Sequence, residues 1–327
     1  MAAVPARWAR EVACGVVITG PRGEWLRARA GLFIVLAIAL AVWLTYAVTG
    51  LTQSRDHLAV RADQPPHSAA ATALPPPVRC ASCWRPAASE SWQIQLSSTP
   101  VRPFPRVGMI DVDGFGTPAS TVAALHRTSR GRGVLCYIDA GTWENWRPDA
   151  GQFPRSLLGR NDGRWSGERW LDIAKFRGAL ARIMRARAQM CQRKGFNGID
   201  FDNVDGYQNN TGFRLTSADQ LRYDIFLANT AHSLGLSVAL KNDVGQIPAL
   251  IRYFDFAIDE QCFQYADCLA SENGGRFGLN EFVAAHKAVF DIEYNQKLSR
   301  FCPAARRDRF NALLKHLNLG PWRRSCG

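Results

Sequence analysis

The stretch GFNGIDFDNVDGY, residues 195–207, decides the fold. An apolar run takes up Asp200 and Asp202 at alternate positions and then ends in a turn that contains Asp205. Because side chains alternate along a strand, the first two carboxylates share one face and their apolar neighbours share the other. Carboxylates at the end of a buried strand are costly to bury and are typical of a functional site. A turn or helix-capping cluster is the alternative interpretation.

The rest of the chain repeats this strand pattern between helical patterns. The predicted strands are Trp92–Leu96, Val107–Asp111, Gly133–Asp139, Asn197–Asp202, Leu236–Lys241, Phe254–Asp259, Ala288–Glu293 and Asn311–Lys315. The predicted helices are Ser120–Thr128, Ile173–Arg193, Ser217–Ser233 and Leu279–Ala285. Strands that alternate with helices indicate a parallel sheet, and eight such units match the size of a (β/α)8 TIM-type barrel. A doubly wound open sheet is the alternative, but no glycine-rich phosphate loop follows the first strand.

Polar and aromatic residues recur at the carboxyl ends of these strands, which form one rim in a barrel and carry the active sites of that fold. The candidate site residues are Tyr137, Asp139, Trp143, Asp200, Asp202, Asp205, Tyr207, Lys241, Glu260 and Glu293. Pyranose rings stack on aromatic side chains, and cleavage of a glycosidic bond needs one protonated and one ionised carboxyl group. Crowding of carboxylates separates their pKa values, as that division requires. The rim therefore favours a glycosidase.

Other chemistries are less well supported. The chain has no G-x-S-x-G elbow and no H-E-x-x-H motif. A hard-metal site made of Asp139, Asp202, Asp205 and Glu260 stays open as an alternative, although we expect neither a metal nor a cofactor. A glycan-binding barrel without turnover is the alternative function.

The N-terminal region predicts a membrane anchor. Residues 31–51 contain no charged side chain and are long enough to cross a bilayer as a helix. The basic tail at 1–30 carries five Arg against two Glu, so the positive-inside rule places it in the cytoplasm. A Pro/Ala-rich segment at 52–79 predicts a disordered linker, and 80–327 predicts one barrel domain outside the cell. A cleaved signal peptide is the alternative.

Charge and cysteine content agree with that compartment. The net charge of +12 is compatible with an anionic surface or polymer nearby. No basic stripe interleaved with aromatic residues points to nucleic acid. Eight of the nine cysteines follow the apolar span, so disulfides are expected. The preferred local pairs are Cys262 with Cys268 and Cys302 with Cys326. A zinc site is the alternative for the Cys80-x-x-Cys83 motif. Cys136 is expected to pack as a small hydrophobic side chain.

Several segments together resemble glycoside hydrolase family 114, the endo-α-1,4-polygalactosaminidases. They are WQIQLSS (92–98), VLCYIDAGTWENWRPDAGQFP (134–154), GERWLDI (167–173), GFNGIDFDNVDGYQNNTGFRLTSADQL (195–221), LKND (240–243), FAIDEQCFQYADC (256–268) and IEY (292–294). The resemblance implies a (β/α)8 barrel that cleaves α-1,4-linked, partly deacetylated galactosamine polymers without a cofactor. We expect a monomer whose partners are this polysaccharide and the membrane.

The resemblance also implies a catalytic pair. The Asp of its D-N-V-D-G-Y motif corresponds to Asp202, and the Glu of its E-Q-C-F motif corresponds to Glu260. The family often has G-V-E-P-D-N where this chain has Asp200 as the first acid, and it often has Ser where Asp139 stands. Both departures line the predicted rim, so they bear on substrate preference more than on the reaction.

Overall fold

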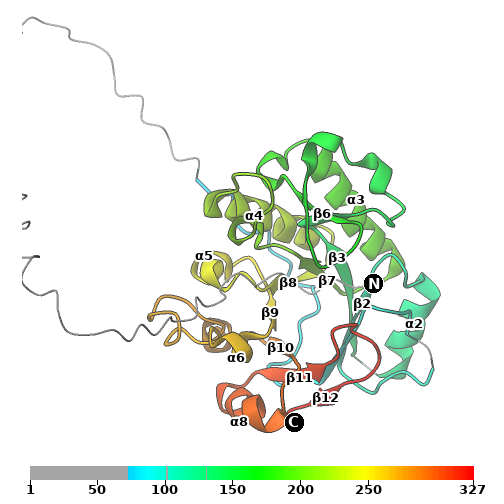
Figure 1. Ribbon diagram of the computed structural model, residues 1–327. Helices are drawn as coiled ribbons and strands as arrows, with labels where there is room; N and C mark the ends of the chain where they lie inside the picture. Colours follow the sequence, from blue (N-terminus) through cyan, green and yellow to red (C-terminus); the bar gives the residue numbers. More distant parts are fainter. Residues whose placement is uncertain (1–72, 101, 130) are drawn as a thin grey trace, which may run out of the picture. The chain divides into compact units, whose positions relative to one another are not determined.

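The computed structural model describes residues 73–100, 102–129 and 131–327. Parallel strands form its central sheet (Figure 1), in the order β1-β2-β3-β7-β8-β9-β10-β11. Their bounds are β1 Trp92–Gln95, β2 Met109–Asp113, β3 Gly133–Asp139, β7 Gly198–Asp202, β8 Ser237–Lys241, β9 Phe256–Glu260, β10 Val289–Tyr294 and β11 Asn311–Lys315. All eight predicted strands are therefore present. A short β12, Arg324–Ser325, pairs antiparallel with β11.

The sheet curls until its first and last long strands meet. The indole Nε1 of Trp92 in β1 donates to the carbonyl oxygen of Asn311 in β11 at 2.7 Å. Lys315, the last residue of β11, donates its Nζ to Gln93 Oε1 in β1 at 2.9 Å. The backbone N–H of Leu96 bonds to the carbonyl of Leu319, so the C-terminal segment also seals the seam. The mixed α/β fold is confirmed, and the curled sheet is consistent with the predicted barrel.

Helices cover the outside of the sheet (Figure 1). They are α2 Ala119–Thr128, α3 Ala179–Lys194, α4 Ser217–Ser233, α5 Ile247–Leu250, α6 Cys262–Tyr265, α7 Asn280–Ala284 and α8 Leu298–Asp308. Single 3-10 turns are η1 Ala150–Gln152, η2 Arg155–Leu157, η3 Ile173–Lys175, η4 Gly206–Gln208 and η5 Val244–Gln246. The helix expected at 173–193 is divided into η3 and α3, because Gly178 between them has a φ of 110°, outside the helical range.

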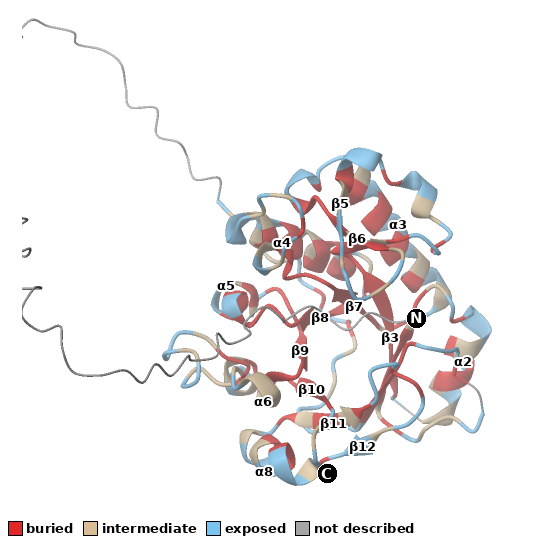
Figure 2. Cartoon of the chain, in the orientation of Figure 1, coloured by how far each residue is buried: buried red, intermediate tan, exposed pale blue. Residues whose placement is uncertain are grey.

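Two hydrophobic clusters follow from strand alternation. One fills the interior of the curled sheet and includes Tyr137, Phe256 and Phe290. The other lies between the strands and the covering helices and includes Ile199 and Phe201 from the opposite face of β7. Figure 2 shows the parallel strands of the central sheet as buried almost throughout. Since Asp200 and Asp202 alternate with this outer pair, their side chains belong to the interior face.

A three-stranded antiparallel sheet lies between β3 and α3 in the chain. Its order is β4-β6-β5, with β4 Thr142–Glu144, β5 Leu158–Asn161 and β6 Glu168–Leu171. The backbone N–H of Leu171 bonds to the carbonyl of Gly141, which ties this sheet to the turn after β3. Its short, polar strands have no clear period-two pattern, and for that reason the sequence did not predict them.

Four disulfides are present in the described part of the chain. Cys262–Cys268 and Cys302–Cys326 confirm the two predicted pairs. The expectation that Cys136 packs as a free hydrophobe is wrong, since it is joined to Cys191 and links β3 to α3. The fourth bond joins Cys80 to Cys83, which replaces the zinc alternative.

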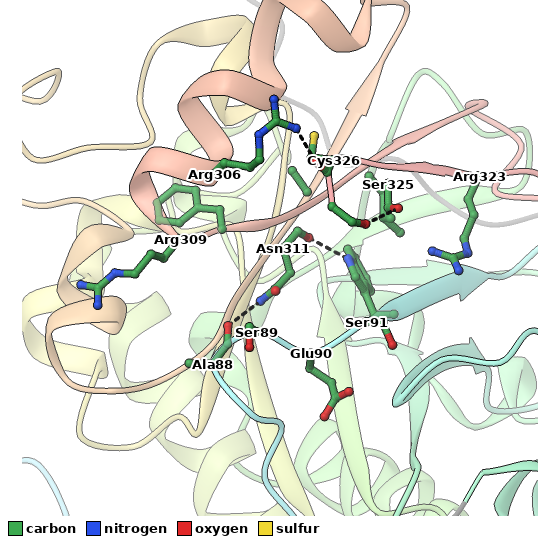
Figure 3. A pocket seen from close by; sticks show the side chains of 15 residues that line it. Ala88, Ser89, Glu90, Ser91, Arg306, Arg309, Asn311, Arg323, Ser325 and Cys326 are labelled. Carbon is green, nitrogen blue, oxygen red and sulfur yellow. Dashed lines mark hydrogen bonds between the residues drawn. The ribbon is translucent and has the colours of Figure 1, made fainter.

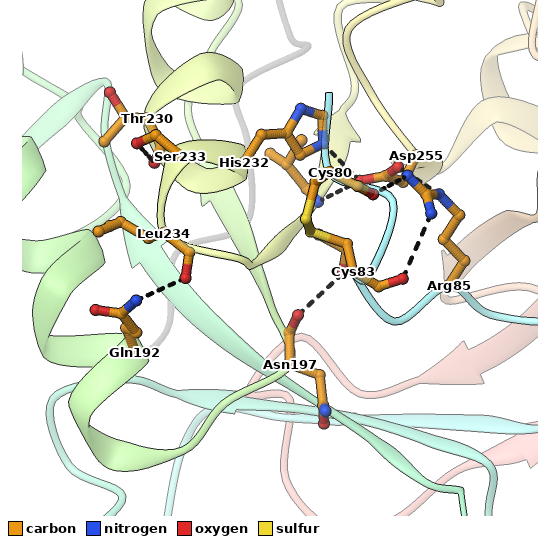
Figure 4. The surroundings of a disulfide bond; sticks show 12 residues. Cys80, Cys83, Arg85, Gln192, Asn197, Thr230, His232, Ser233, Leu234 and Asp255 are labelled. Carbon is orange, nitrogen blue, oxygen red and sulfur yellow. Dashed lines mark hydrogen bonds and ion pairs between the residues drawn. A yellow bond between two sulfur atoms is a disulfide. The ribbon is translucent and has the colours of Figure 1, made fainter. Parts of the chain in front are cut away.

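The surroundings of the Cys80–Cys83 bond explain how its turn is held (Figure 4). Arg85 donates to the carbonyl of Cys80 at 2.9 Å and to Asp255 Oδ1 at 2.8 Å. The other oxygen of Asp255 lies 2.8 Å from His232 Nε2. Asp255 precedes β9, so this network fastens the N-terminal segment to the amino-terminal end of the sheet.

The folded part begins before the predicted domain boundary at residue 80. Leu74 packs against the outer hydrophobic cluster. The carbonyl of Pro75 accepts a hydrogen bond from Tyr253 at 2.7 Å, and that of Pro76 accepts one from Asn229 at 3.1 Å. The last residues of the predicted linker therefore belong to the domain.

The predicted cytoplasmic tail, the membrane span at 31–51 and most of the linker lie outside the described residues. None of the helices that the structure does describe combines the length and the apolarity that a bilayer crossing requires.

Candidate active site

Three charged side chains from neighbouring strands meet at the carboxyl end of the sheet. Asp202 ends β7, Lys241 ends β8 and Glu260 ends β9. Lys241 Nζ donates to Asp202 Oδ1 at 2.9 Å and lies 3.6 Å from Glu260 Oε1. All three side chains are buried, with at most 3% of any residue exposed. One ammonium group thus sits between the two predicted catalytic carboxylates.

Two tyrosines complete this arrangement from strands on either side. Tyr137 in β3 donates its hydroxyl to Asp202 Oδ2 at 2.6 Å. Tyr294 at the end of β10 donates to Glu260 Oε1 at 3.0 Å. Both tyrosines are fully buried. Tyr137 was predicted as a site residue, whereas Tyr294 was not.

The two carboxylates have different electrostatic surroundings. Burial raises the pKa of Glu260 to about 8; the charge of Asp202 adds to this, while Lys241 and the Tyr294 hydroxyl oppose it. Glu260 Oε2 is buried and has no hydrogen-bond partner among the described residues. Burial acts to lower the pKa of Lys241, but Asp202 and Glu260 outweigh it and raise that pKa well above its usual range. These surroundings favour the protonated form of Glu260 and the charged form of Lys241.

A second pair of acids lies deeper on the interior face. Burial raises the pKa of Asp200 to about 6, against the opposing charge of Lys241. Burial and then the neighbouring Asp200 raise the pKa of Asp111 well above its usual range. Asp200 was predicted to lie two positions below Asp202 on one face, and β7 places it there. None of its surface is exposed, and it lies beneath the predicted catalytic pair.

The other predicted residues are distributed around this centre. Asp139 lies beside Asp202 in the strand register, but its oxygens accept hydrogen bonds from Thr142 and Asn203. Trp143 donates its indole N–H to the carbonyl of Ala150. These contacts are to protein groups and leave substrate contact by Asp139 and Trp143 as a prediction.

Asp205 lies in the turn after β7, directly before η4, and Tyr207 lies within η4. The Tyr207 hydroxyl donates to Asp243 Oδ1 at 3.1 Å. Asp205 is 1% exposed and accepts a hydrogen bond from Asn209. Substrate contact by these two residues likewise stays a prediction.

Glu293 does not join the group at the rim. Its Oε1 accepts hydrogen bonds from the backbone N–H groups of Phe263 at 2.8 Å and Gln264 at 3.2 Å, at the start of α6. In β10 the side chains of Ile292 and Tyr294, the residues before and after Glu293, occupy the interior face. The prediction chose the polar residue at the strand end, whereas the alternation of β10 places its neighbour Tyr294 inside.

The described residues contain carboxylate groups that could hold a metal ion, but not the predicted set. Asp139, Glu144 and Glu168 bring one oxygen each within 4.8 Å of one another. Arg147 already pairs with both oxygens of Glu144, at 2.5 and 2.7 Å. Hydrogen-bond donors also occupy both oxygens of Asp139. Asp139 and Glu144 therefore already have protein partners, whereas Glu168 Oε1 has none among the described residues.

A cavity of about 580 Å³ lies away from this centre (Figure 3). Trp92 and Asn311, the first residues of β1 and β11, line it together with Arg306, Arg309 and Arg323. It lies by the amino-terminal ends of these strands and contains none of the predicted site residues. The carboxylate pair at the other end of the sheet therefore remains the candidate active site.

Comparison with known proteins decides the family. The model of glycoside-hydrolase family GH114 matches residues 74–327. The chain belongs to this family. The crystal structure of Aspergillus fumigatus Ega3 in complex with galactosamine has 36% sequence identity, covers 74% of this chain and 97% of that chain, and has a TM-score of 0.67. The GH114 protein described here is therefore a glycosidase, as its sequence predicted.

Two more distant proteins are similar. The glycoside hydrolase domain of PelA from Pseudomonas aeruginosa shares the fold at 13% identity, with a TM-score of 0.53 over 72% of this chain and 98% of that domain. An uncharacterized protein of Deinococcus radiodurans is 24% identical over 241 residues, which cover 69% of this chain and 76% of that protein.

Proposed function

We propose that this GH114 glycosidase cleaves an α-1,4-linked polysaccharide of galactosamine and N-acetylgalactosamine, with Asp202 and Glu260 as the reacting carboxyl groups. The arrangement of these two groups around Lys241 carries the proposal, because glycosidic bond cleavage needs one ionised and one protonated carboxyl group. Similarity to Ega3, whose structure holds galactosamine, supports the choice of sugar.

The two carboxyl groups divide the chemistry. Glu260, whose pKa is raised to about 8 and whose Oε2 has no partner in the described chain, protonates the glycosidic oxygen as the bond breaks. Asp202 accepts hydrogen bonds from Lys241 and Tyr137 and acts as the anionic group at the anomeric carbon. The proton and the negative charge thus lie on different residues before substrate arrives.

The spacing of the pair favours retention of anomeric configuration. Asp202 Oδ1 and Glu260 Oε1 contact one ammonium nitrogen at 2.9 and 3.6 Å, so their separation cannot exceed the sum of these distances. Retaining enzymes hold their carboxyl groups about 5–5.5 Å apart, and inverting enzymes roughly 6.5–9.5 Å apart. Asp202 then forms a glycosyl ester, and Glu260 takes a proton from the water that hydrolyses it.

The carboxyl groups around Glu168 would accommodate an amino sugar as substrate. Burial raises the pKa of Glu168 to about 10, and the charges of Asp139 and Glu144 add to it. Glu168 Oε1 is buried and lacks a hydrogen-bond partner in the described part of the chain. A protonated amine on the substrate would offset this local excess of carboxyl groups, although the chain as a whole is basic.

We also propose that the enzyme is anchored in the cell membrane by residues 31–51, with its N-terminus in the cytoplasm and its domain outside. The uncharged span, the Arg-rich tail before it and the four disulfides after it support this location. Protease added to intact cells should remove the domain. A protected domain, or one released into the medium without residues 31–51, would contradict the anchor.

The reaction can be tested with the purified full-length protein and a defined set of polymers. Galactosamine, N-acetylgalactosamine, mixed and uronic-acid polymers are incubated separately, and new reducing ends are counted. We expect cleavage of the polymers that contain galactosamine and none of the uronic-acid polymer. A protein that carries both D202N and E260Q is the control for contaminating activity. Absence of cleavage in the whole set would reject the proposed reaction.

A further inference from the structure

The turns that follow β3 and β7 are locked together beside the catalytic pair. The backbone N–H groups of Ala140 and Gly141 donate to the carbonyl oxygen of Asp202 at 3.0 and 3.1 Å. A Cβ atom on Gly141 would lie 1.7 Å from the carbonyl oxygen of Asn203, which no side chain permits. Asp139 and Asp202 are also partners in the register of the two strands. The position of Asp202 is therefore set by the turn after β3 as well as by β7.

Asn203, directly after Asp202, has an unusual backbone conformation. Its φ is 59°, in the left-handed region that non-glycine residues other than Asn and Asp seldom adopt. In this conformation its backbone N–H donates to Asp202 Oδ1 at 2.8 Å. The left-handed turn thus supplies a hydrogen bond to the carboxylate beside it, in addition to those from Lys241 and Tyr137.

Asp139 holds the side chain of Asn203. Asn203 Nδ2 donates to Asp139 Oδ2 at 2.8 Å. Thr142 donates its backbone N–H to Oδ1 at 2.7 Å and its hydroxyl to Oδ2 at 2.5 Å. Asp139 has no exposed surface. Protein donors thus engage both oxygens of Asp139, and one of these donors is the side chain of Asn203, the residue directly after Asp202.

We propose that Asp139 is a positioning residue that holds Asn203 in its left-handed conformation, so that the Asn203 N–H fixes the carboxylate of Asp202 for attack on the sugar. This inference rests on the proposed role of Asp202. In this role Asp139 affects the rate of the chemical step, and other residues determine the affinity for substrate. Loss of the Asp139 anchor should lower kcat and leave KM nearly unchanged.

The first test compares two changes at the same residue. N203A and N203G both remove the side chain that Asp139 holds, but glycine adopts a φ near 60° without strain and alanine does not. We expect N203G to lower kcat about threefold. N203A should lower it roughly tenfold further, with both KM values within about twofold of the wild type. Equal kcat values for the two variants would overturn the role of the backbone conformation.

The second test asks whether Asp139 acts through Asn203. D139N keeps the shape of the side chain but replaces one acceptor oxygen with an amide N–H₂ that faces a donor at either position, so kcat should fall about 30-fold. In the N203G background the same change should cost less than about twofold, because glycine no longer needs the anchor. If D139N instead raises KM, or costs as much in both backgrounds, Asp139 contacts substrate or merely supports the fold.

Controls separate these outcomes from misfolding and from a wrong reaction. D255N changes a buried Asp that is also fully hydrogen-bonded but precedes β9, at the amino-terminal end of the sheet; it should lower the melting temperature and spare kcat. A crystal structure of D139N gives a readout without turnover. Asn203 should leave the left-handed region there, and a retained N–H contact to Asp202 would overturn the inference even if no polymer is cleaved.

Discussion

Asp202 and Glu260 share one ammonium group, and each also accepts a hydrogen bond from a buried tyrosine. A change to either carboxyl group should therefore impair catalysis by the pair. We expect D202N and E260Q each to lower kcat by at least about 10²–10⁴-fold. Each variant keeps the shape of the side chain but can no longer carry the negative charge or donate the proton. The double variant should be little slower than the worse single variant. Reducing-end release measures all three proteins, and near-normal turnover by either single variant removes that residue from the mechanism.

The pKa of Glu260 predicts the alkaline limit of activity. Burial raises this pKa to about 8, and the acid must carry its proton to act on the leaving group. We expect kcat/KM, which reports the free enzyme, to be constant just below this value and to fall tenfold per pH unit well above it. Y294F removes the hydrogen bond that lowers the Glu260 pKa, so its alkaline limb should move to higher pH. A wild-type rate that stays level through pH 9.5 would assign the acid elsewhere.

The sequence could predict the site residues that lie on strands, because side chains alternate between the two faces of a strand. Period two placed Asp200 and Asp202 on one face, and the ends of β8 and β9 supplied Lys241 and Glu260. The same rule applied from Phe290 would have found Tyr294 in place of Glu293. The left-handed turn at Asn203 leaves no periodic signal, because it depends on contacts with the turn after β3.

At the scale of elements, long buried strands were predictable and short polar ones were not. All eight long strands carry apolar runs that read directly from the chain. The β4-β6-β5 sheet depends on pairing between segments that lack such runs. The bond between Cys136 and Cys191 was missed for a similar reason. Their 55-residue separation gives no local signal, and contact arises only when α3 packs on β3.

This long-range disulfide should contribute more to stability than the shortest one. In the chain-entropy account, closing a loop of 55 residues stabilises the folded state by about 4 kcal/mol, and closing one of three residues by roughly 2 kcal/mol. We expect C136A/C191A to lower the urea midpoint clearly more than C80A/C83A. Both pairs are buried, which makes the second double variant a matched control. A larger loss from C80A/C83A would show that native contacts around Arg85 outweigh chain entropy.

Several buried carboxyl groups have pKa values above their ordinary range, which makes the stability of the whole molecule depend on pH. Burial raises the pKa of Asp200 to about 6, that of Glu293 to about 7 and that of Glu260 to about 8, from ordinary values of 3.8, 4.5 and 4.5. Between pH 4.5 and 7 the unfolded chain has lost protons that the folded chain still binds. Unfolding therefore releases protons, and raising the pH favours unfolding.

We accordingly expect the melting temperature to fall as the pH rises from 4.5 to 7, which calorimetry can measure in buffers of equal ionic strength. Above pH 7 the slope should lessen, because burial lowers the pKa of Lys315 to about 7 and this buried amine acts in the opposite direction. E293Q is the matched control, since its amide oxygen can still accept the two backbone hydrogen bonds at α6 while the titrating proton is gone. Its melting temperature should fall less over the same interval. A melting temperature that rises between pH 4.5 and 7 would mean that these carboxyl groups ionise in the folded protein, and Glu260 could then not serve as the acid at neutral pH.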